Sequence, residues 1–181
     1  MLHLKNITAG NPKTAEQYQM TKRHSIVWLF SEDGRNWYEE QKNFASDTIK
    51  VAYSEKGRVV WVGKYVTGIE PTNVSIIELP DITANRRITA PGFWFYRNDE
   101  FVFDHKLKAE DERDALLKQV SIMTSDWEKD LLLGLISDED REKLKAYRIY
   151  AKSLQAMDFS TITDKTSYNA INWPERPDAA A

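Results

Sequence analysis

The residue types that support catalysis are few in this sequence, and their spacing argues against an active site. There is no cysteine, which excludes a thiol nucleophile, a thiolate metal site and a disulfide framework. The three histidines, His3, His24 and His105, are far apart and predict no metal cluster, and no H-E-x-x-H pair occurs. No serine stands in a G-x-S-x-G motif, and the seven glycines show no phosphate-binding spacing.

Two pairs of adjacent carboxylates remain as candidates for acid–base chemistry: Glu39-Glu40 and Glu110-Asp111. Glycoside hydrolysis needs two carboxylates that face each other across a sugar-sized cleft and differ in pKa. Neighbours on a strand point to opposite faces, so Glu39 and Glu40 alone cannot form such a pair. We interpret these side chains as solvated surface. The sequence therefore predicts no enzyme, no cofactor and no metal.

Aromatic residues are the more informative group. Four of the six tryptophans fall in expected strands: Trp28, Trp37, Trp61 and Trp94. Cross-strand aromatic pairs contribute roughly 0.2–1 kcal/mol relative to alanine, so core packing is the favoured interpretation. Four strand tryptophans are more than a small sheet normally encloses. The alternative interpretation is therefore that at least one ring is exposed and contacts a protein or stacks on a sugar.

The chain ends in a W-P-x-x-P arrangement formed by Trp173, Pro174 and Pro177. Each proline fixes φ and disfavours helix in the residue before it, so a stiff extended tail is expected. Such a tail can be a polyproline ligand for an aromatic groove on another protein. Alternatively, Trp173 folds back and anchors the tail on the preceding helices. We favour the anchor, because an indole in a polar tail is costly to leave in water.

Charge and hydropathy limit the partners. The 181 residues carry a net charge of −3, with 25 basic and 28 acidic residues interleaved. Nucleic-acid binders usually present a basic face, so no nucleic-acid partner is expected. No stretch approaches the ~18 apolar residues of a membrane span. The N-terminus lacks the basic and apolar regions of a secretory signal. A soluble intracellular protein without membrane insertion is predicted.

The first half of the chain shows short β-rich runs separated by turn residues. Their connections are too short for parallel crossovers, so an antiparallel hairpin meander in one or two small sheets is predicted. The expected hairpins and strands are 25–30 with 37–38, 48–53 with 58–62, 74–79 alone, and 93–96 with 101–103.

Beyond residue 106 the apolar period becomes helical. A stripe over about 108–133 predicts a first helix that ends at Gly134, and Ser137 can cap a second helix. The short gap between the helices makes them antiparallel neighbours. The stripe residues are Leu116, Val120, Met123, Trp127 and Leu131, followed by Leu144, Tyr147, Ala151 and Leu154. Neither helix can hide its stripe entirely, so a partner is expected, either the β-rich half or another chain.

These elements predict an α+β fold: the antiparallel meander, then the helix pair and an extended C-terminal tail. The predicted domains are 1–90, which is β-rich, and 91–181, which holds the last hairpin, the helical hairpin and the tail.

The chain resembles the tail fibre assembly proteins of tailed bacteriophages and enterobacterial prophages. The likeness spans nearly the whole chain, and departs from the family at 61–73, in the first helix, and at Tyr147, where tryptophan is frequent. The stretches that carry it are HLKNI at 3–7, NPKT at 11–14, QYQ at 17–19, WLFSEDG at 28–34, NWYE at 36–39, DTIK at 47–50 and PDITANRR at 80–87, followed by Trp94, Leu144, Tyr147, Tyr150, Leu154, Trp173-Pro174 and Pro177.

The resemblance implies a chaperone rather than an enzyme, working without a cofactor in the host cytoplasm. Such a protein binds the C-terminal tip of the tail fibre and helps three fibre chains fold and trimerise in register. We expect 1–90 to recognise the fibre, with Trp28, Phe30, Trp37 and Tyr38 as hypothetical contacts. The assembly domain 91–181 is expected to hold the protein together and to mediate self-association. Its hypothetical assembly residues are Leu144, Tyr147, Leu154, Trp173, Pro174 and Pro177.

Two other function classes remain open at this stage. In the first, the protein stays on the fibre tip of the virion and binds polysaccharide of the host surface. In the second, supported only by aromatic and carboxylate residues, it is a carbohydrate-active enzyme.

Overall fold

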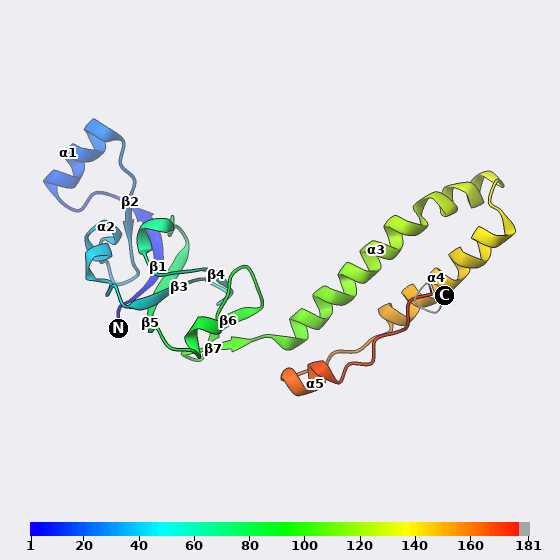
Figure 1. The fold of residues 1–181 in the computed structure, drawn as a ribbon. Coiled ribbons are helices and arrows are strands. Elements are labelled where there is room, and N and C mark those ends of the chain that lie inside the picture. Colours follow the sequence, from blue (N-terminus) through cyan, green and yellow to red (C-terminus); the bar gives the residue numbers. More distant parts are fainter. Residues whose placement is uncertain (178–181) are drawn as a thin grey trace. The chain divides into compact units, whose positions relative to one another are not determined.

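The computed structural model describes residues 1–177, which form two compact units that begin at Met1 and at Asp104 (Figure 1). The first unit contains β1 (His3–Gly10), α1 (Ala15–His24), β2 (Trp28–Phe30), α2 (Trp37–Glu40), β3 (Thr48–Ser54), β4 (Val59–Gly63), β5 (Val74–Pro80), β6 (Trp94–Arg97) and β7 (Glu100–Phe103). The second contains α3 (His105–Leu133), α4 (Asp138–Gln155) and α5 (Lys165–Asn169).

The first unit is built on a five-stranded antiparallel sheet with the order β2-β1-β5-β3-β4. β1 pairs with β5 through its first half and with β2 through its second half. The register shifts between Leu4 and Ile7, where Asn6 adopts a positive φ of 44°. Both Leu4 and Ile7 are fully buried in the core of this sheet. The bulge therefore lets one strand serve two neighbours without losing its core residues.

The α+β class and the antiparallel pairing predicted from the sequence are confirmed, as are the β3–β4 and β6–β7 hairpins. The sheet is not a simple meander, because β5 lies between β1 and β3. β1 and α1 had not been predicted. Their sequences are largely polar, so hydrophobic period gave little signal for either.

The expected strand at 37–38 is wrong. Trp37–Glu40 forms a helical turn, and the Asn36 side chain accepts a hydrogen bond from the Tyr38 amide at 3.0 Å. An asparagine in this position caps a helix N-terminus, and that local bond competes with strand pairing. What remains of the expected hairpin is an isolated bridge between Phe30 and Asn36.

The β6–β7 hairpin belongs to the first unit. The boundary between the compact units along the chain is therefore 103/104, whereas the predicted domain boundary was 90/91. The Tyr96 amide donates a hydrogen bond to the Gly57 carbonyl at 2.7 Å, and the Tyr96 ring lies 4.5 Å from that of Tyr53. These contacts tie the hairpin to the β3–β4 turn. Residues 178–181 of the predicted second domain lie outside the described residues. The functional roles assigned to the two halves stay predictions.

The second unit contains the predicted antiparallel helix pair. α3 ends at Gly134, which has a positive φ of 71°, and Ser137 caps α4 by accepting from the Asp140 amide. The core between the helices consists of Val120, Tyr147, Tyr150, Ala151 and Leu154. The α3 stripe is only partly used, because its members Met123 and Leu131 are exposed.

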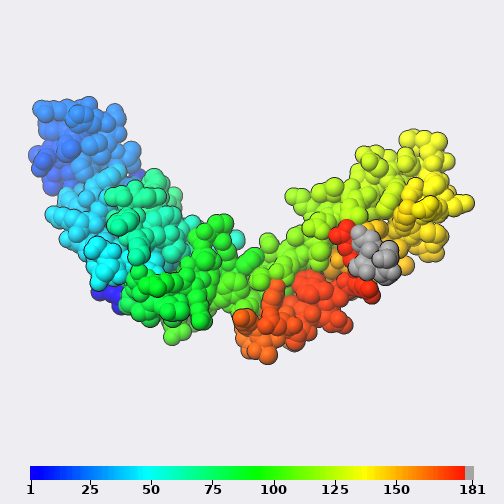
Figure 2. Space-filling view, in the orientation of Figure 1, coloured from blue at the N-terminus to red at the C-terminus, as the bar shows by residue number. Residues whose placement is uncertain are grey.

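The tail folds back along the helices (Figures 1 and 2). Its short helix α5, which had not been predicted, begins with a capping box between Asp164 and Ser167. Trp173 lies 5.7 Å from the Phe159 ring, centroid to centroid, and packs against the helix-pair core. Trp173 therefore occupies the folded-back position rather than projecting as a free ligand.

Candidate protein interfaces

Three of the four aromatic residues predicted to contact a fibre are buried. The Trp28 indole donates hydrogen bonds to the Gln17 carbonyl at 3.2 Å and to the Thr21 hydroxyl at 2.8 Å, both on α1. Phe30 is covered by the Lys13 ammonium, 4.1 Å from its ring centre, and Trp37 is 2% exposed. α1 covers Trp28, Leu29 lies in the core of the sheet and Lys13 covers Phe30, so all three residues of β2 are buried.

Tyr38 is the member of this group that reaches the surface, with 46% of its area exposed. Its ring stands edge-to-face on Trp28 at 5.8 Å, and its hydroxyl donates to the Val27 carbonyl at 2.9 Å. Val27 is itself exposed. The two residues form a small fixed apolar area, the Val27–Tyr38 spot, supported from below by Trp28.

The outer edge of β4 is a second candidate interface, which sequence reasoning did not identify. β4 is the last strand of the sheet order. β6 contacts it, and Arg58, the residue just before β4, forms an isolated bridge to Phe95, but β4 itself belongs to no further strand ladder within residues 1–177. Val60 in the strand and Tyr65 just after it are both exposed. An edge strand offers unpaired backbone N–H and C=O groups to another chain. The turn at Gly57 was a signal for the hairpin, but nothing in the sequence showed which strand would end the sheet.

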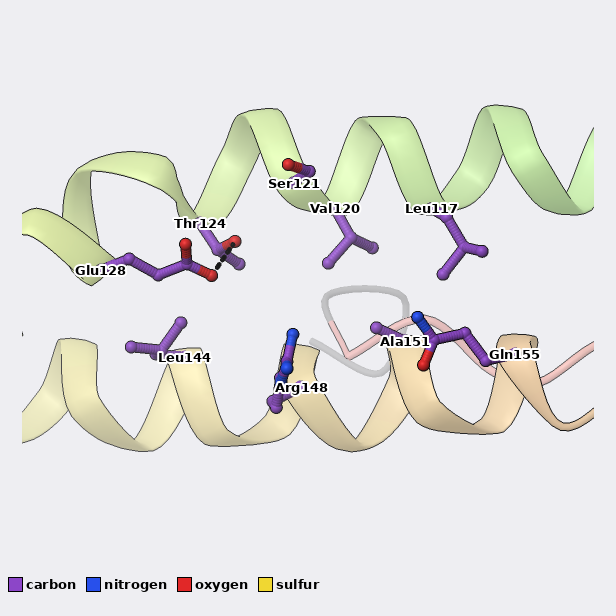
Figure 3. Close-up of a pocket in the computed structure, with 9 residues that line it drawn as sticks. All are labelled: Leu117, Val120, Ser121, Thr124, Glu128, Leu144, Arg148, Ala151 and Gln155. Atoms are coloured by element: carbon purple, nitrogen blue, oxygen red, sulfur yellow. Dashed lines mark hydrogen bonds between the residues drawn. The ribbon is translucent and has the colours of Figure 1, made fainter.

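A groove runs along one flank of the α3–α4 pair (Figure 3). Its two adjoining hollows have volumes of about 220 and 350 Å³ and share Glu128, Leu144 and Arg148. The hollow nearer the tip of the hairpin is mostly apolar, whereas the other hollow is mostly polar, and the Arg148 side chain stands between the helices. Glu128 accepts a hydrogen bond from the Thr124 hydroxyl at 3.2 Å. The groove residues are Leu117, Val120, Ser121, Thr124, Glu128, Leu131, Arg141, Leu144, Lys145, Arg148, Ala151 and Gln155.

The tip of the helical hairpin is unusually apolar for an exposed turn. Leu132, Leu133 and Leu135 are largely exposed, and Leu131 is partly so. Exposed apolar patches of this kind mark interaction surfaces. The run LLLGL was the available signal, but the period placed Leu131 on an internal stripe and the others received no role.

The residues predicted to act in assembly mainly hold the second unit together. Leu144, Tyr147 and Leu154 are buried, and the Tyr147 ring lies 6.1 Å from that of Trp127. The tail members Trp173, Pro174 and Pro177 are half-buried. Of the predicted set, Leu144 alone also lines the groove.

The first unit also carries a polar hollow of about 370 Å³, lined by His3, Lys5, Glu32 and Asp33. Hydrogen bonds from Arg35 and from a serine hydroxyl hold the pKa of Asp33 at about 2. Burial lowers the pKa of His3, whose ring is hydrogen-bonded to a tyrosine hydroxyl. Asp33 forms an ion pair with Arg35 at 2.8 Å. Over residues 1–177 no cluster of metal-ligating side chains is found, and none of the described helices has the length and apolarity to cross a bilayer.

The fold and its surfaces define an α+β protein whose exposed features are a strand edge, an aromatic spot and a helical groove with an apolar end, all suited to contact with protein chains. The chain belongs to the family described as Caudovirales tail fibre assembly protein, lambda gpK, whose profile matches residues 39–178.

Individual relatives extend this match over nearly the whole chain. The sequence is 42% identical to tail fiber assembly protein U' of Escherichia phage Mu and 43% identical to tail fiber assembly protein U' of Escherichia phage P1. It is 36% identical to tail fiber assembly protein U of Escherichia phage Mu. Each alignment covers 98% of this chain and 100% of the relative. The resemblance seen in the sequence is confirmed.

Proposed function

We propose that this protein is a tail fibre chaperone that binds the C-terminal tip of the fibre and promotes its in-register folding and trimerisation. It acts by binding alone, in the host cytoplasm during assembly. Family membership supports the role in fibre assembly. The observation that supports the mechanism is the unpaired outer edge of β4.

The physical problem that such a chaperone solves is the exposed end of an incomplete β-rich trimer. Unpaired strands aggregate or pair with the wrong neighbour, and a slip of one residue turns every side chain to the opposite face. The β4 edge offers a temporary pairing partner for one such strand. Exposed Val60 and Tyr65 flank the edge and add apolar contact. Pairing of this kind is reversible, so the fibre strand can leave when its own neighbours arrive.

The Val27–Tyr38 spot is the second fibre contact in this proposal. Of the four predicted residues, Tyr38 would touch the fibre, while Trp28, Phe30 and Trp37 would keep the surface in shape from within the core. An aromatic ring fixed by an edge-to-face contact and a hydrogen bond loses little entropy on binding, which favours its use as an anchor.

Co-expression with the C-terminal fragment of the cognate fibre tests the proposal. We expect detergent-resistant fibre trimer only when this chain is present. Val60→Lys should lower the yield several-fold, because a lysine on the edge discourages strand pairing. Val102→Lys, at another exposed strand valine, is the matched control and should leave the yield unchanged. Equal trimer with and without this chain would contradict the chaperone function, and a normal yield with Val60→Lys would contradict the role of β4.

Retention on the fibre tip with binding of host polysaccharide is the second candidate. The polar hollow at His3 and Asp33 favours it, because its wall combines charged side chains with the ring of a histidine packed on tyrosines. Detection of this chain in finished particles, together with direct binding of host polysaccharide by the purified chain, would support it.

A further inference from the structure

We propose that a hollow at the end of β4 holds the C-terminal residue of the fibre chain, with the apolar side chain of that residue on the floor of the hollow and its free carboxylate at the rim. The inference rests on the proposed function, because that function supplies a fibre end as the ligand. It goes further by naming the chemical group that is recognised and the residues that recognise it.

The hollow lies within the first unit and includes the last residues of the edge strand. It has a volume of about 280 Å³, and most of its surface is apolar. A water molecule takes up roughly 30 Å³ in the liquid, so the hollow has room for a side chain. The residues that line it are Ile49, Val62, Gly63, Lys64, Asp81 and Arg86.

Two cations and one carboxylate form the polar part of the hollow. The Asp81 carboxylate accepts a hydrogen bond from Arg86 Nε at 2.6 Å, and Lys64 Nζ lies 3.1 Å from its other oxygen. Arg86 and Lys64 hold the pKa of Asp81 below its ordinary value, so this group is ionised at neutral pH. Two positive charges and one negative charge leave an excess of one positive charge.

The two cations remain accessible although they are paired. The side chains of Lys64 and Arg86 are 58% and 63% exposed, whereas that of Asp81 is 15% exposed. Asp81 therefore lies behind the cations and holds them in place. A second carboxylate that approaches from solvent meets the two cations, and its charge neutralises the excess.

The loop that carries Arg86 is fixed by its own contacts. Arg86 Nη2 donates to the Asp81 carbonyl at 3.2 Å, and the Asn85 side-chain amide donates to the Pro80 carbonyl at 2.9 Å. Ile88, which ends this loop, is buried in the core. A guanidinium that is already oriented loses little entropy when a ligand binds, which favours recognition at this position.

The combination of an apolar floor with a cationic rim identifies the ligand. A C-terminal residue with an apolar side chain bears both groups on one carbon atom, so it can contact Ile49 and Val62 while its carboxylate reaches Arg86. Aspartate and glutamate carry the carboxylate at the end of the side chain and cannot place an apolar group on the floor at the same time. Capture of a terminal carboxylate is an established mode of peptide recognition.

The position of the hollow also predicts the direction of the bound strand. Val62 and Gly63 are the last residues of β4, and Lys64 follows them directly. A fibre strand that pairs with the outer edge of β4 in parallel orientation ends at this hollow, and an antiparallel strand begins there. Binding of a C-terminal residue therefore requires the parallel orientation.

Binding of a short peptide with the C-terminal sequence of the cognate fibre to the full chain tests the proposal. Calorimetric titration should show that the peptide with a free carboxylate binds at least about tenfold more tightly than its C-terminal amide, because the amide loses the charge-assisted contacts. A third peptide keeps the free C-terminus but has amides in place of its Asp and Glu side-chain carboxylates. It should bind as tightly as the first.

Two substitutions in the hollow should change the affinity in opposite directions. Arg86→Gln should weaken binding of the acid about tenfold and leave the amide unchanged. Asp81→Asn removes a competing negative charge but keeps a carbonyl acceptor, so it should raise the ratio of acid to amide affinity several-fold. Arg87→Gln is the matched control, because Arg87 is an exposed neighbour that does not line the hollow. It should leave this ratio unchanged.

Equal affinity for acid and amide, or no binding of either, would overturn the proposal. Dependence on the internal carboxylates alone would also overturn it and would assign the hollow to a side-chain carboxylate. The fibre trimer formed on co-expression distinguishes this failure from failure of the chaperone function. Trimer that requires this chain but forms equally well with Arg86→Gln would contradict the role of the hollow only, whereas trimer that forms without this chain would contradict the function.

Discussion

Lys50 on β3 stands directly opposite Glu78 on β5, and both side chains are buried. Glu78 accepts hydrogen bonds from the Thr48 hydroxyl at 2.7 Å and from the Leu2 amide at 3.1 Å. The Lys50 ammonium donates to the carbonyls of Ala45 and Thr48. The pair joins the N-terminal strand, the segment before β3 and two central strands, so its charges serve the fold of the first unit.

Glu78→Gln should destabilise the first unit, and the effect should depend on pH. Burial raises the pKa of Glu78, but the hydrogen bonds from Thr48 and two amides, together with Lys50, outweigh it and hold the pKa below its ordinary value of 4.5. A lowered pKa in the folded state contributes stability above pH 4.5, which is lost as the pH falls through the folded pKa. We expect a loss of about 1–3 kcal/mol in unfolding free energy at neutral pH.

Urea unfolding from pH 7 to pH 3 measures this effect. The wild-type midpoint should fall on the acid side, and the gap between wild type and Glu78→Gln should narrow there. Glu55→Gln, at an exposed turn position, is the control. A gap that stays constant with pH would show that the carboxylate is not the source of the effect.

Gly57→Ala should separate the β3–β4 turn from the β6–β7 hairpin. Gly57 has a φ of 81°, and an added Cβ would stand against the Tyr96 carbonyl oxygen. We expect the free energy of unfolding to fall by at least about 2 kcal/mol, and hydrogen exchange at the amide of Tyr96 to become faster. Gly134→Ala has a similar φ of 71° but meets nothing within 4 Å, so it should cost only about 1 kcal/mol. Equal losses for the two variants would exclude the steric contact.

Trp37→Ala and Tyr38→Ser should affect different properties although the residues are adjacent: the first should lower stability, and the second should lower fibre binding. Trp37 lies in the core, so its truncation should lower the unfolding free energy by about 3–5 kcal/mol. Tyr38 loses an edge-to-face contact and one exposed hydrogen bond, so Tyr38→Ser should cost less than about 2 kcal/mol while lowering fibre capture. Thermal unfolding and co-purification with the fibre fragment measure the two effects. Normal fibre capture by folded Tyr38→Ser would remove Tyr38 from the interface.

Trp173→Ala should release the tail from the helix pair. Trp173 contacts Phe159 and the core around Leu154, but it is only half-buried, so we expect a loss of about 2 kcal/mol. Hydrogen exchange across 157–177 should accelerate, while the amides of α4 around Leu154 should change little. Asn172→Ala, at the exposed neighbouring position, should have no effect. Unchanged exchange in the Trp173→Ala tail would show that the anchor lies elsewhere.

The candidate interfaces were less predictable than the elements that carry them. Core packing was the favoured interpretation of the strand tryptophans, but Trp28 and Trp37 were also named as hypothetical fibre contacts. Both are buried, and the polar helix α1 that covers Trp28 has little apolar period. The sequence could not show that β4 is an edge strand, because the order of the strands in a sheet decides which strand is at the edge, and the sequence of one strand does not reveal that order. The sequence shows Leu132, Leu133 and Leu135, but it does not show that their side chains are exposed.

The sequence by itself determined the α+β class, the β3–β4 and β6–β7 hairpins, both long helices and the family, because these rest on local period, capping residues and contiguous motifs. Tertiary structure alone decided the insertion of β5 between β1 and β3, the placement of the last hairpin with the first unit, and the exposure of Tyr38, Val60 and Leu132. The reason is physical. The hydrophobic period of a segment shows which of its residues share one face, but whether that face is buried depends on segments distant in the chain.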